Sequence, residues 1–291
     1  MFRAPFRSLG YILGLILCAA TISNAQSNTC TFHKVQLGTD YTSVYGINNN
    51  GAIVGTYNPN AMSQAAYILK SGVATTIFYP GASMTSGFGI NDNQDIVGSY
   101  VPPGVGAPTY GFEYVNGFFT SLSFPGGSIM TQAVGINRAG IVVGTYQDSK
   151  AITHGFAYVN QKYTSITYPG ARATFAGAIN NKNVVAGGYT DTANVEHGFI
   201  WSSGKFTVVD YPGAANTIVS QVNDNGVIAG TYYDSTFSTW TGFVDVNGTF
   251  QPITDPIAPT ETAVNGLSDG NVLVGNADYS GAGFAATGCV P

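Results

Sequence analysis

The stretch that decides the fold is Ala133-Val134-Gly135-Ile136-Asn137-Arg138-Ala139-Gly140-Ile141-Val142-Val143-Gly144-Thr145-Tyr146. It consists of two short apolar runs joined by a polar turn. Asn137 is suited to cap its own backbone, and Gly140 tolerates the left-handed conformation with which such a turn ends. The run from Ile141 to Tyr146 is rich in β-branched residues, which is typical of a strand buried on both faces. The stretch therefore predicts two strands joined by a tight turn.

The same phrase occurs six times along the chain. Its copies begin with Gly46-Ile47-Asn48, Gly89-Ile90-Asn91, Gly135-Ile136-Asn137, Ala178-Ile179-Asn180, Gln221-Val222-Asn223 and Gly266-Leu267-Ser268. The aliphatic residues of successive copies lie 43, 46, 43, 43 and 45 positions apart. A period of about 40–45 residues that holds four strand patterns is the signature of a propeller blade. The sequence therefore predicts an all-β, six-bladed β-propeller with four strands per blade.

The blades are expected at about residues 42-79, 85-124, 131-168, 174-211, 217-254 and 262-288. A Pro-Gly step such as Pro169-Gly170 ends the fourth strand, because Pro cannot donate to a ladder. First strands converge on the propeller axis, which explains the small residue that opens most copies of the repeat. Gln221 is the exception, and we expect its side chain to reach into the central channel.

The last blade lacks a fourth strand at the C-terminal end of the repeats. The segment from Thr31 to Leu37 resembles Lys205 to Tyr211 and is expected to supply that strand, which would close the ring and remove its open edges. Cys30 and Cys289 then stand on the two sides of the interrupted hairpin. We expect them to form a disulfide that replaces the missing turn.

The first residues predict export. Arg3 and Arg7 precede an apolar run from Tyr11 to Ala20, and Ser23-Asn24-Ala25 provides small residues for cleavage. This pattern predicts a secretory signal peptide over residues 1-25. The apolar run, of about ten residues, is too short for a membrane span. The mature chain, residues 26-291, is expected to be a single secreted domain, extracellular or periplasmic, with no transmembrane segment.

Composition excludes one class of partner. Charged residues make up 9% of the chain, and its formal net charge is −5. Removal of the two signal-peptide arginines lowers this charge to about −7, and the remaining Lys and Arg form no cluster. A mildly acidic chain without a basic patch is not suited to bind nucleic acid phosphates.

The repeats resemble a known family. Gly-Ile-Asn, a Val-Gly-Thr/Ser-Tyr strand and His-Gly-Phe are similar to the repeats of bacterial HAF-repeat extracellular proteins, over residues 31 to 288. The His-Ala-Phe element of that family corresponds here to His154-Gly155-Phe156 and His197-Gly198-Phe199. The resemblance implies an exported, propeller-like array and implies no reaction.

Three successive blades place polar and aromatic residues in the loops between their second and third strands, on the face where propellers usually bind ligands. The candidate ligand-binding residues are Tyr146, Asp148, His154, Tyr189, Asp191, His197, Tyr232, Asp234 and Trp240. In a ligand-binding interpretation they form an aromatic and carboxylate arc. In a structural interpretation, each Asp caps its loop and each Tyr seals the rim of the core. This interpretation is favoured because residues at equivalent positions of a repeat usually have structural roles.

Other chemistry finds little support in the sequence. His154 and His197 lack a third His or Cys for a metal site, and neither a metal nor a cofactor is expected. The six innermost strands contain no Asp or Glu, whereas a glycosidase needs two facing carboxylates. The expected function is therefore non-catalytic binding or scaffolding, with a glycan, another cell-surface polymer or a protein as partner. The alternative is a lyase or hydrolase that uses the His154/His197 side of the ring.

Overall fold

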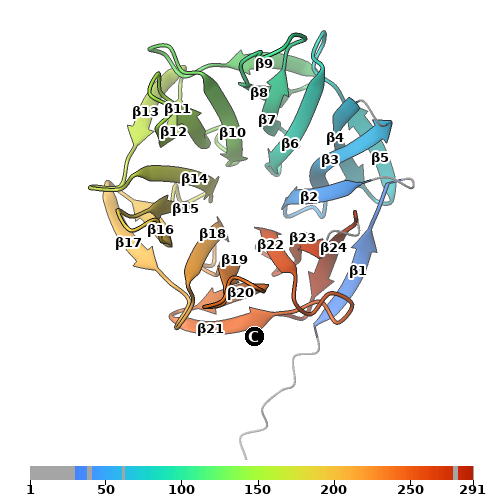
Figure 1. Cartoon of the computed structure of the whole chain (residues 1–291). Coiled ribbons are helices and arrows are strands. Elements are labelled where there is room, and N and C mark those ends of the chain that lie inside the picture. The colour runs from blue at the N-terminus through green and yellow to red at the C-terminus, as the bar shows by residue number, and fades with distance from the viewer. Residues whose placement is uncertain (1–29, 38–40, 61–62, 278–280, 291) are drawn as a thin grey trace, which may run out of the picture.

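The computed structural model describes residues 30–37, 41–60, 63–277 and 281–290, so the expected signal peptide lies outside the described residues. Strands arranged around a central axis form a ring, as expected for a β-propeller (Figure 1). No helix long and apolar enough to cross a membrane occurs in the described ranges.

Each copy of the sequence repeat forms an antiparallel set of strands, named here repeats 1 to 6. Repeat 1 contains β2 (Thr42–Ile47), β3 (Ile53–Asn60), β4 (Ser63–Lys70) and β5 (Val73–Ile77). Repeat 2 contains β6 (Met84–Ile90), β7 (Ile96–Val101), β8 (Tyr110–Val115) and β9 (Phe118–Leu122). Repeat 3 contains β10 (Met130–Ile136), β11 (Val142–Gln147), β12 (Thr153–Val159) and β13 (Lys162–Ile166).

The remaining strands follow the same plan. Repeat 4 contains β14 (Ala173–Ile179), β15 (Val185–Thr190), β16 (Glu196–Ser202) and β17 (Lys205–Val209). Repeat 5 contains β18 (Asn216–Val222), β19 (Ile228–Tyr233), β20 (Trp240–Val246) and β21 (Thr249–Ile253). Repeat 6 contains β22 (Thr262–Leu267), β23 (Leu273–Ala277), β24 (Gly283–Thr287) and β1 (Thr31–Val35).

The expectation of six separate four-stranded sheets is confirmed only in part. Repeats 3 to 6 are separate four-stranded sheets, whereas repeats 1 and 2 join into one sheet of eight strands. One parallel pair, Gln64 with Met84, makes this connection. Equivalent contacts elsewhere are only isolated bridges, Thr109, just before β8, with Met130, and Trp240 with Glu261, just before β22. In repeat 1 both paired residues lie within strands, because β4 is long enough to include Gln64, so the two repeats form one continuous sheet.

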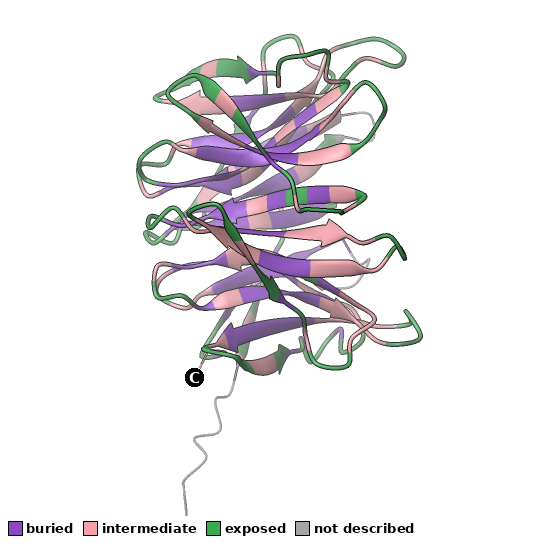
Figure 2. Ribbon diagram, turned by 90° about the vertical axis from the view of Figure 1, so that its left-hand side faces the viewer, coloured by how far each residue is buried: buried purple, intermediate pink, exposed green. Residues whose placement is uncertain are grey.

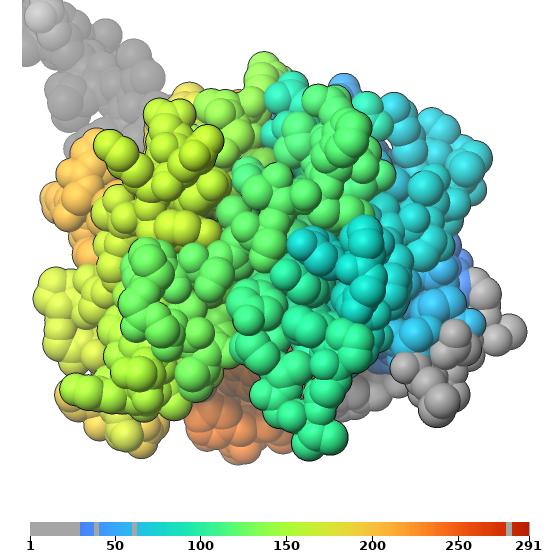
Figure 3. Space-filling model, turned by 90° about the horizontal axis from the view of Figure 1, so that it is seen from above, coloured from blue at the N-terminus to red at the C-terminus, as the bar shows by residue number. Residues whose placement is uncertain are grey.

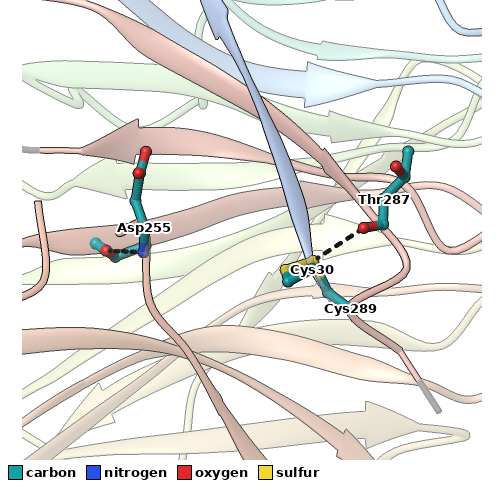
Figure 4. Close-up of a disulfide and its surroundings, with 5 residues drawn as sticks. Cys30, Asp255, Thr287 and Cys289 are labelled. Atoms are coloured by element: carbon teal, nitrogen blue, oxygen red, sulfur yellow. Dashed lines mark hydrogen bonds between the residues drawn. A yellow bond between two sulfur atoms is a disulfide. The ribbon is translucent and has the colours of Figure 1, made fainter. Parts of the chain in front are cut away.

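Closure of the ring by the N-terminal strand is confirmed. β1 pairs antiparallel with β24, from Thr31 opposite Thr287 to Val35 opposite Gly283, and it ends two residues before the expected Leu37. Cys30 and Cys289 form a disulfide with a Cα–Cα distance of 4.4 Å, next to this pair of strands (Figure 4). Cys289 is fully buried, in a cluster that contains Leu273 and Phe284.

The core lies between the sheets. Buried residues occupy the strands and exposed residues occupy the turns at both edges of the ring (Figure 2). From the side, successive repeats follow one another in chain order as a continuous wall (Figure 3). The largest fully buried side chains are one aromatic residue from the third strand of each repeat: Tyr67, Phe112, Phe156, Phe199, Phe243 and Phe284.

The steric explanation for the small residues at the axis is confirmed. A Cβ atom added to Gly46 would lie 2.8 Å from the carbonyl oxygen of Phe88, and one added to Gly135 would lie 2.8 Å from the Cα of Ala178. Real Cβ atoms do not approach other atoms this closely. The inner strands of neighbouring repeats therefore meet backbone to backbone.

Two sets of hydrogen bonds recur around the ring. A buried Thr on the first strand of each repeat accepts a bond from the backbone N–H of the preceding crossing, at 2.9 to 3.0 Å. These threonines are Thr42, Thr85, Thr131, Thr174, Thr217 and Thr262. On the opposite face, the Asn that opens the turn in repeats 1 to 5 caps its own backbone as predicted: Asn137 Oδ1 accepts bonds from Ala139 and Ile141. Ser268 opens the turn of repeat 6 and accepts a bond from Val272.

Candidate functional site

The predicted arc is assembled in repeats 3 and 4. Tyr146 on β11 lies opposite His154 on β12 with the two rings stacked at 5.1 Å, and His154 Nε2 lies 3.3 Å from Asp148 Oδ2. Repeat 4 places Tyr189 opposite His197 at 4.9 Å, and His197 Nε2 lies 3.6 Å from Asp191 Oδ2.

Repeat 5 does not continue this arrangement. Tyr232 lies opposite Thr241, and Trp240 lies opposite Tyr233. Asp234 accepts bonds from its own loop, including the backbone N–H of Ser238 at 2.9 Å and the hydroxyl of Thr236 at 2.7 Å. The structure therefore joins the candidates of repeats 3 and 4 into two similar clusters and leaves those of repeat 5 apart.

Each Asp of the two clusters also organises its own loop. Asp148 Oδ1 accepts hydrogen bonds from the backbone N–H groups of Lys150 and Ile152, at 2.8 and 3.0 Å. Asp191 Oδ1 accepts equivalent bonds from Ala193 and Val195. The bond from Ile152 is the main cause that lowers the pKa of Asp148, and the bond from Val195 does the same for the pKa of Asp191.

The tyrosines pack successive repeats together. Tyr146 stacks on Phe124 at 3.6 Å, and Tyr189 stacks on Tyr168 at the same distance. Tyr232 stacks on Tyr211 at 3.7 Å. In each pair the partner comes from the crossing that leaves the preceding repeat. These contacts give the tyrosines the structural role that their repeat positions suggested.

A larger feature lies on the axis of the ring. A cavity of about 410 Å³ is lined by the first strands of all six repeats and extends to Tyr189, Glu196 and His197 of repeat 4. Of the nine predicted residues, only Tyr189 and His197 line it. Gln221 also lines this cavity, as predicted.

One lining residue of each repeat comes from a bulge in its inner strand. The register between first and second strands shifts by one residue, for example between Ala133 and Gly135. A β-bulge leaves one residue unpaired and redirects its side chain. All six bulged residues line the cavity: Tyr45, Phe88, Val134, Gly177, Ser220 and Asn265.

This ring of bulged residues has two unlike halves. Tyr45 and Phe88 are neighbours, with edge-to-face rings 5.3 Å apart, and Val134 follows them. Burial raises the pKa of the Tyr45 phenol, so this group keeps its proton at neutral pH. The other half is small or polar and ends in Asn265, whose Nδ2 donates to Val44 O at 2.8 Å. The cavity therefore has an aromatic wall that faces a polar one.

The cavity widens towards repeat 4. Gly177 stands where the other repeats carry a bulged side chain, and a Cβ added there would meet no atom closer than 3.6 Å. Gly188 stands where repeats 3 and 5 carry Thr145 and Thr231. Glu196, at the start of the third strand β16, lines the cavity at this point, although the sequence analysis did not single it out.

A histidine and one carboxylate, His197 and Glu196, line this widening, and two further carboxylates contact the histidine. His197 Nδ1 lies 2.8 Å from Asp210 Oδ2, in addition to its contact with Asp191. Asp210 follows β17, at a position that is Thr167 in repeat 3. Glu196 is partly buried, and no side-chain hydrogen bond or ion pair of its carboxylate occurs within the described ranges. Its oxygens are therefore available to a ligand.

Aliphatic residues close the cavity on one side. Ile47, Ile90, Ile136 and Ile179 line both this cavity and a smaller one of about 70 Å³ on the opposite face. Each of these residues is almost fully buried. They form the floor of the larger cavity. The described residues include no group of three His, Cys, Asp or Glu side chains suited to hold a metal ion.

These features define the class of the protein as an all-β propeller with a central cavity. No protein-family model and no curated protein matches the chain. Solved structures match its fold. AofleA from Arthrobotrys oligospora is 15% identical, with 86% of this chain and 84% of that chain covered and a TM-score of 0.52.

Two further structures have the same fold. The fungal lectin from Aleuria aurantia, a six-bladed β-propeller with a fucose recognition mode, is 13% identical, with 84% of this chain and 91% of that chain covered and a TM-score of 0.51. TolB from Acinetobacter baumannii is 11% identical, with 85% and 63% covered and a TM-score of 0.53. At these identities the likeness extends to the fold alone.

Proposed function

We propose that this protein is an exported, non-catalytic propeller that binds a glycan in its central cavity. The observation that carries the proposal is the ring of bulged residues, which places an aromatic wall opposite a polar one. Sugars present apolar ring faces, which stack on aromatic side chains, and hydroxyl groups, which need polar partners. The cavity volume of about 410 Å³ lies within the range of about 300–1,000 Å³ that small-molecule sites occupy.

Repeats 4 and 5 supply the polar groups for this ligand. The Glu196 carboxylate can accept hydrogen bonds from sugar hydroxyls, and the side-chain amide of Gln221, which also lines the cavity, can donate one. A lectin among the similar folds, the one from Aleuria aurantia, recognises fucose. That likeness supports the choice of a glycan and does not select the sugar.

The proposal includes the architecture and the location. We take the eight-stranded sheet as two blades joined by one parallel pair, so that the ring is six-bladed. The Cys30–Cys289 disulfide supports export to an oxidising compartment, where such bonds persist. The repeat sequence supports membership among the HAF-repeat extracellular proteins.

A glycan array tests the proposed function. The mature wild-type protein should bind a defined set of glycans, and Gly177→Phe should abolish that binding because its ring would fill the cavity. Gly270→Phe is the matched control, because Gly270 lies in an exposed turn outside the cavity and its backbone tolerates a side chain. Absence of glycan binding by the wild-type protein, or binding that survives Gly177→Phe, would contradict the proposal.

One observation favours a catalytic function as the alternative. His197 lies between two carboxylates and beside Glu196, on the wall of the cavity. An imidazole oriented by a carboxylate can act as a general base. A panel of glycoside hydrolase and polysaccharide lyase substrates tests this alternative. Turnover that is lost in His197→Ala or His154→Ala would replace the binding function with a lyase or hydrolase.

A further inference from the structure

A second site is separate from the central cavity. A groove of about 440 Å³ lies along the junction of repeats 4 and 5, bordered by β17 on one side and by β19 to β21 on the other. Its apolar lining includes Ile200, Val208 and Phe250. Thr207 and Asn247 contribute polar groups to the same groove.

The groove contains a buried carboxylate without a partner. Asp245, on β20, is 6% exposed and lines the groove. Its Oδ1 atom is buried and has no hydrogen-bond partner, and no ion pair reaches the side chain within the described ranges. Burial of a charge without a partner is expensive, and native proteins usually compensate it. The carboxylate is therefore suited to bind a cationic or hydrogen-bond-donating group.

The sequence shows that Asp245 is an exception to its repeat. It stands two residues after the buried Phe243, where the other repeats carry Leu69, Tyr114, Tyr158, Trp201 and Ala286. Trp201 packs towards the preceding repeat, in a cluster with Val143. An Asp at this position leaves room between repeats 4 and 5, whereas repeats 2 to 4 carry a larger, partly buried aromatic ring there. The replacement of a larger side chain by Asp245 thus accounts for both the groove and the carboxylate in it.

We propose that this groove binds the free amino group of an amino sugar, with Asp245 as its counter-ion. Both charged residues of the lining, Asp210 and Asp245, are acidic, so an ammonium group is favoured over an anion. Asp210 is already bonded to His197, which leaves Asp245 as the acceptor. Thr207 and Asn247 can bind sugar hydroxyls, and Phe250 offers an apolar face to the ring. These polar groups favour an amino sugar over the alkyl chain of a lysine.

Calorimetric titration of the mature protein tests the proposal. The probes are a glucosamine tetrasaccharide with free amines and its fully N-acetylated form. The wild-type protein should bind the amine form, and Asp245→Asn should weaken this binding about tenfold or more, because it removes the charge and keeps the shape. The N-acetylated form should bind weakly to both. Gly177→Phe should not change the titration, which separates this site from the central cavity.

Two controls keep the result interpretable. Asp245→Leu reproduces the side chain of Leu69, should close the groove and should raise the melting temperature, so that lost binding cannot be ascribed to unfolding. Equal binding of the two tetrasaccharides, or binding unchanged by Asp245→Asn, would overturn the proposal. A lysine-containing peptide that displaces the sugar at equal concentration would instead assign the groove to a protein partner.

Discussion

The side-chain amide of Asn91 donates a 3.0 Å hydrogen bond to the backbone carbonyl of Asn137, the corresponding residue of the next repeat. The same bond runs from Asn137 to Asn180, at 3.2 Å, and from Asn180 to Asn223, at 3.0 Å. Each Asn therefore caps its own turn through its oxygen and reaches the next repeat through its nitrogen. These buried bonds link consecutive repeats around the ring, on the face that carries the turns between first and second strands.

We expect Asn137→Asp to destabilise the protein by about 1–3 kcal/mol, because the carboxylate keeps the cap but cannot donate to Asn180. Chemical denaturation measures the free energy of unfolding. Asn160→Asp, in an exposed hairpin of the same repeat, is the control. Equal stability of the two variants would show that the bond between repeats contributes nothing.

Glycine has different roles at two neighbouring positions of the ring. Gly135→Ala should lower stability by about 1–3 kcal/mol, because its Cβ would overlap the backbone of Ala178. Gly177→Ala should be nearly neutral, because its Cβ meets only ordinary contacts. Thermal unfolding of both variants checks this difference. A large loss in Gly177→Ala would mean that this glycine serves folding rather than the cavity.

Removal of the disulfide should first destabilise the pairing of β1 with β24, which closes the ring. Cys30→Ser should cost about 2–5 kcal/mol. It should also expose β1 to proteolysis, while repeats 2 to 5 stay protected. Limited proteolysis with mass spectrometry identifies the first cleavage, and the non-reduced wild-type protein should yield one linked peptide pair. Two alkylatable thiols in exported protein would contradict the disulfide.

Acid should weaken the loops of repeats 3 and 4. The pKa values of Asp148 and Asp191 lie below their ordinary value in the folded protein, so each stabilises the fold above the unfolded pKa of about 3.9. That contribution is lost as the pH falls through the lower folded pKa. The double variant Asp148→Asn/Asp191→Asn should therefore lose less stability between pH 5 and about pH 2 than the wild type. Parallel curves of melting temperature against pH would contradict this prediction.

The sequence predicted the propeller class because its repeat encodes local structure. The Asx turn at Asn137 depends only on its neighbours in sequence. The small residue at Gly135 is explained by the central axis, which the repeat itself implies. The closing strand and the disulfide followed from counting strands. The fusion of repeats 1 and 2 depends on how far β4 extends, and nothing in the local pattern indicates that length.

The site was harder to predict. Tyr146, Tyr189 and Tyr232 recur at equivalent positions because they pack repeats together, so their recurrence indicated structure rather than binding. The cavity is instead lined by the residue before the small one, which varies from Tyr45 to Asn265. A buried Thr four residues before the small position, such as Thr131, recurs in every repeat and was a missed structural signal.

The bulges have a consequence for how the ligand preference of such a ring can change. The bulged residue is the one position of each inner strand that the pairing ladder leaves out, so the ladder does not restrict which side chain stands there. Only in repeats 5 and 6, among the described residues, do the bulged side chains bond to the backbone of the following repeat, from Ser220 to Val264 and from Asn265 to Val44. Six such positions face one another across the axis, each on its own repeat. Evolution or design can exchange them one at a time, and the selectivity of the cavity can drift while the scaffold remains the same.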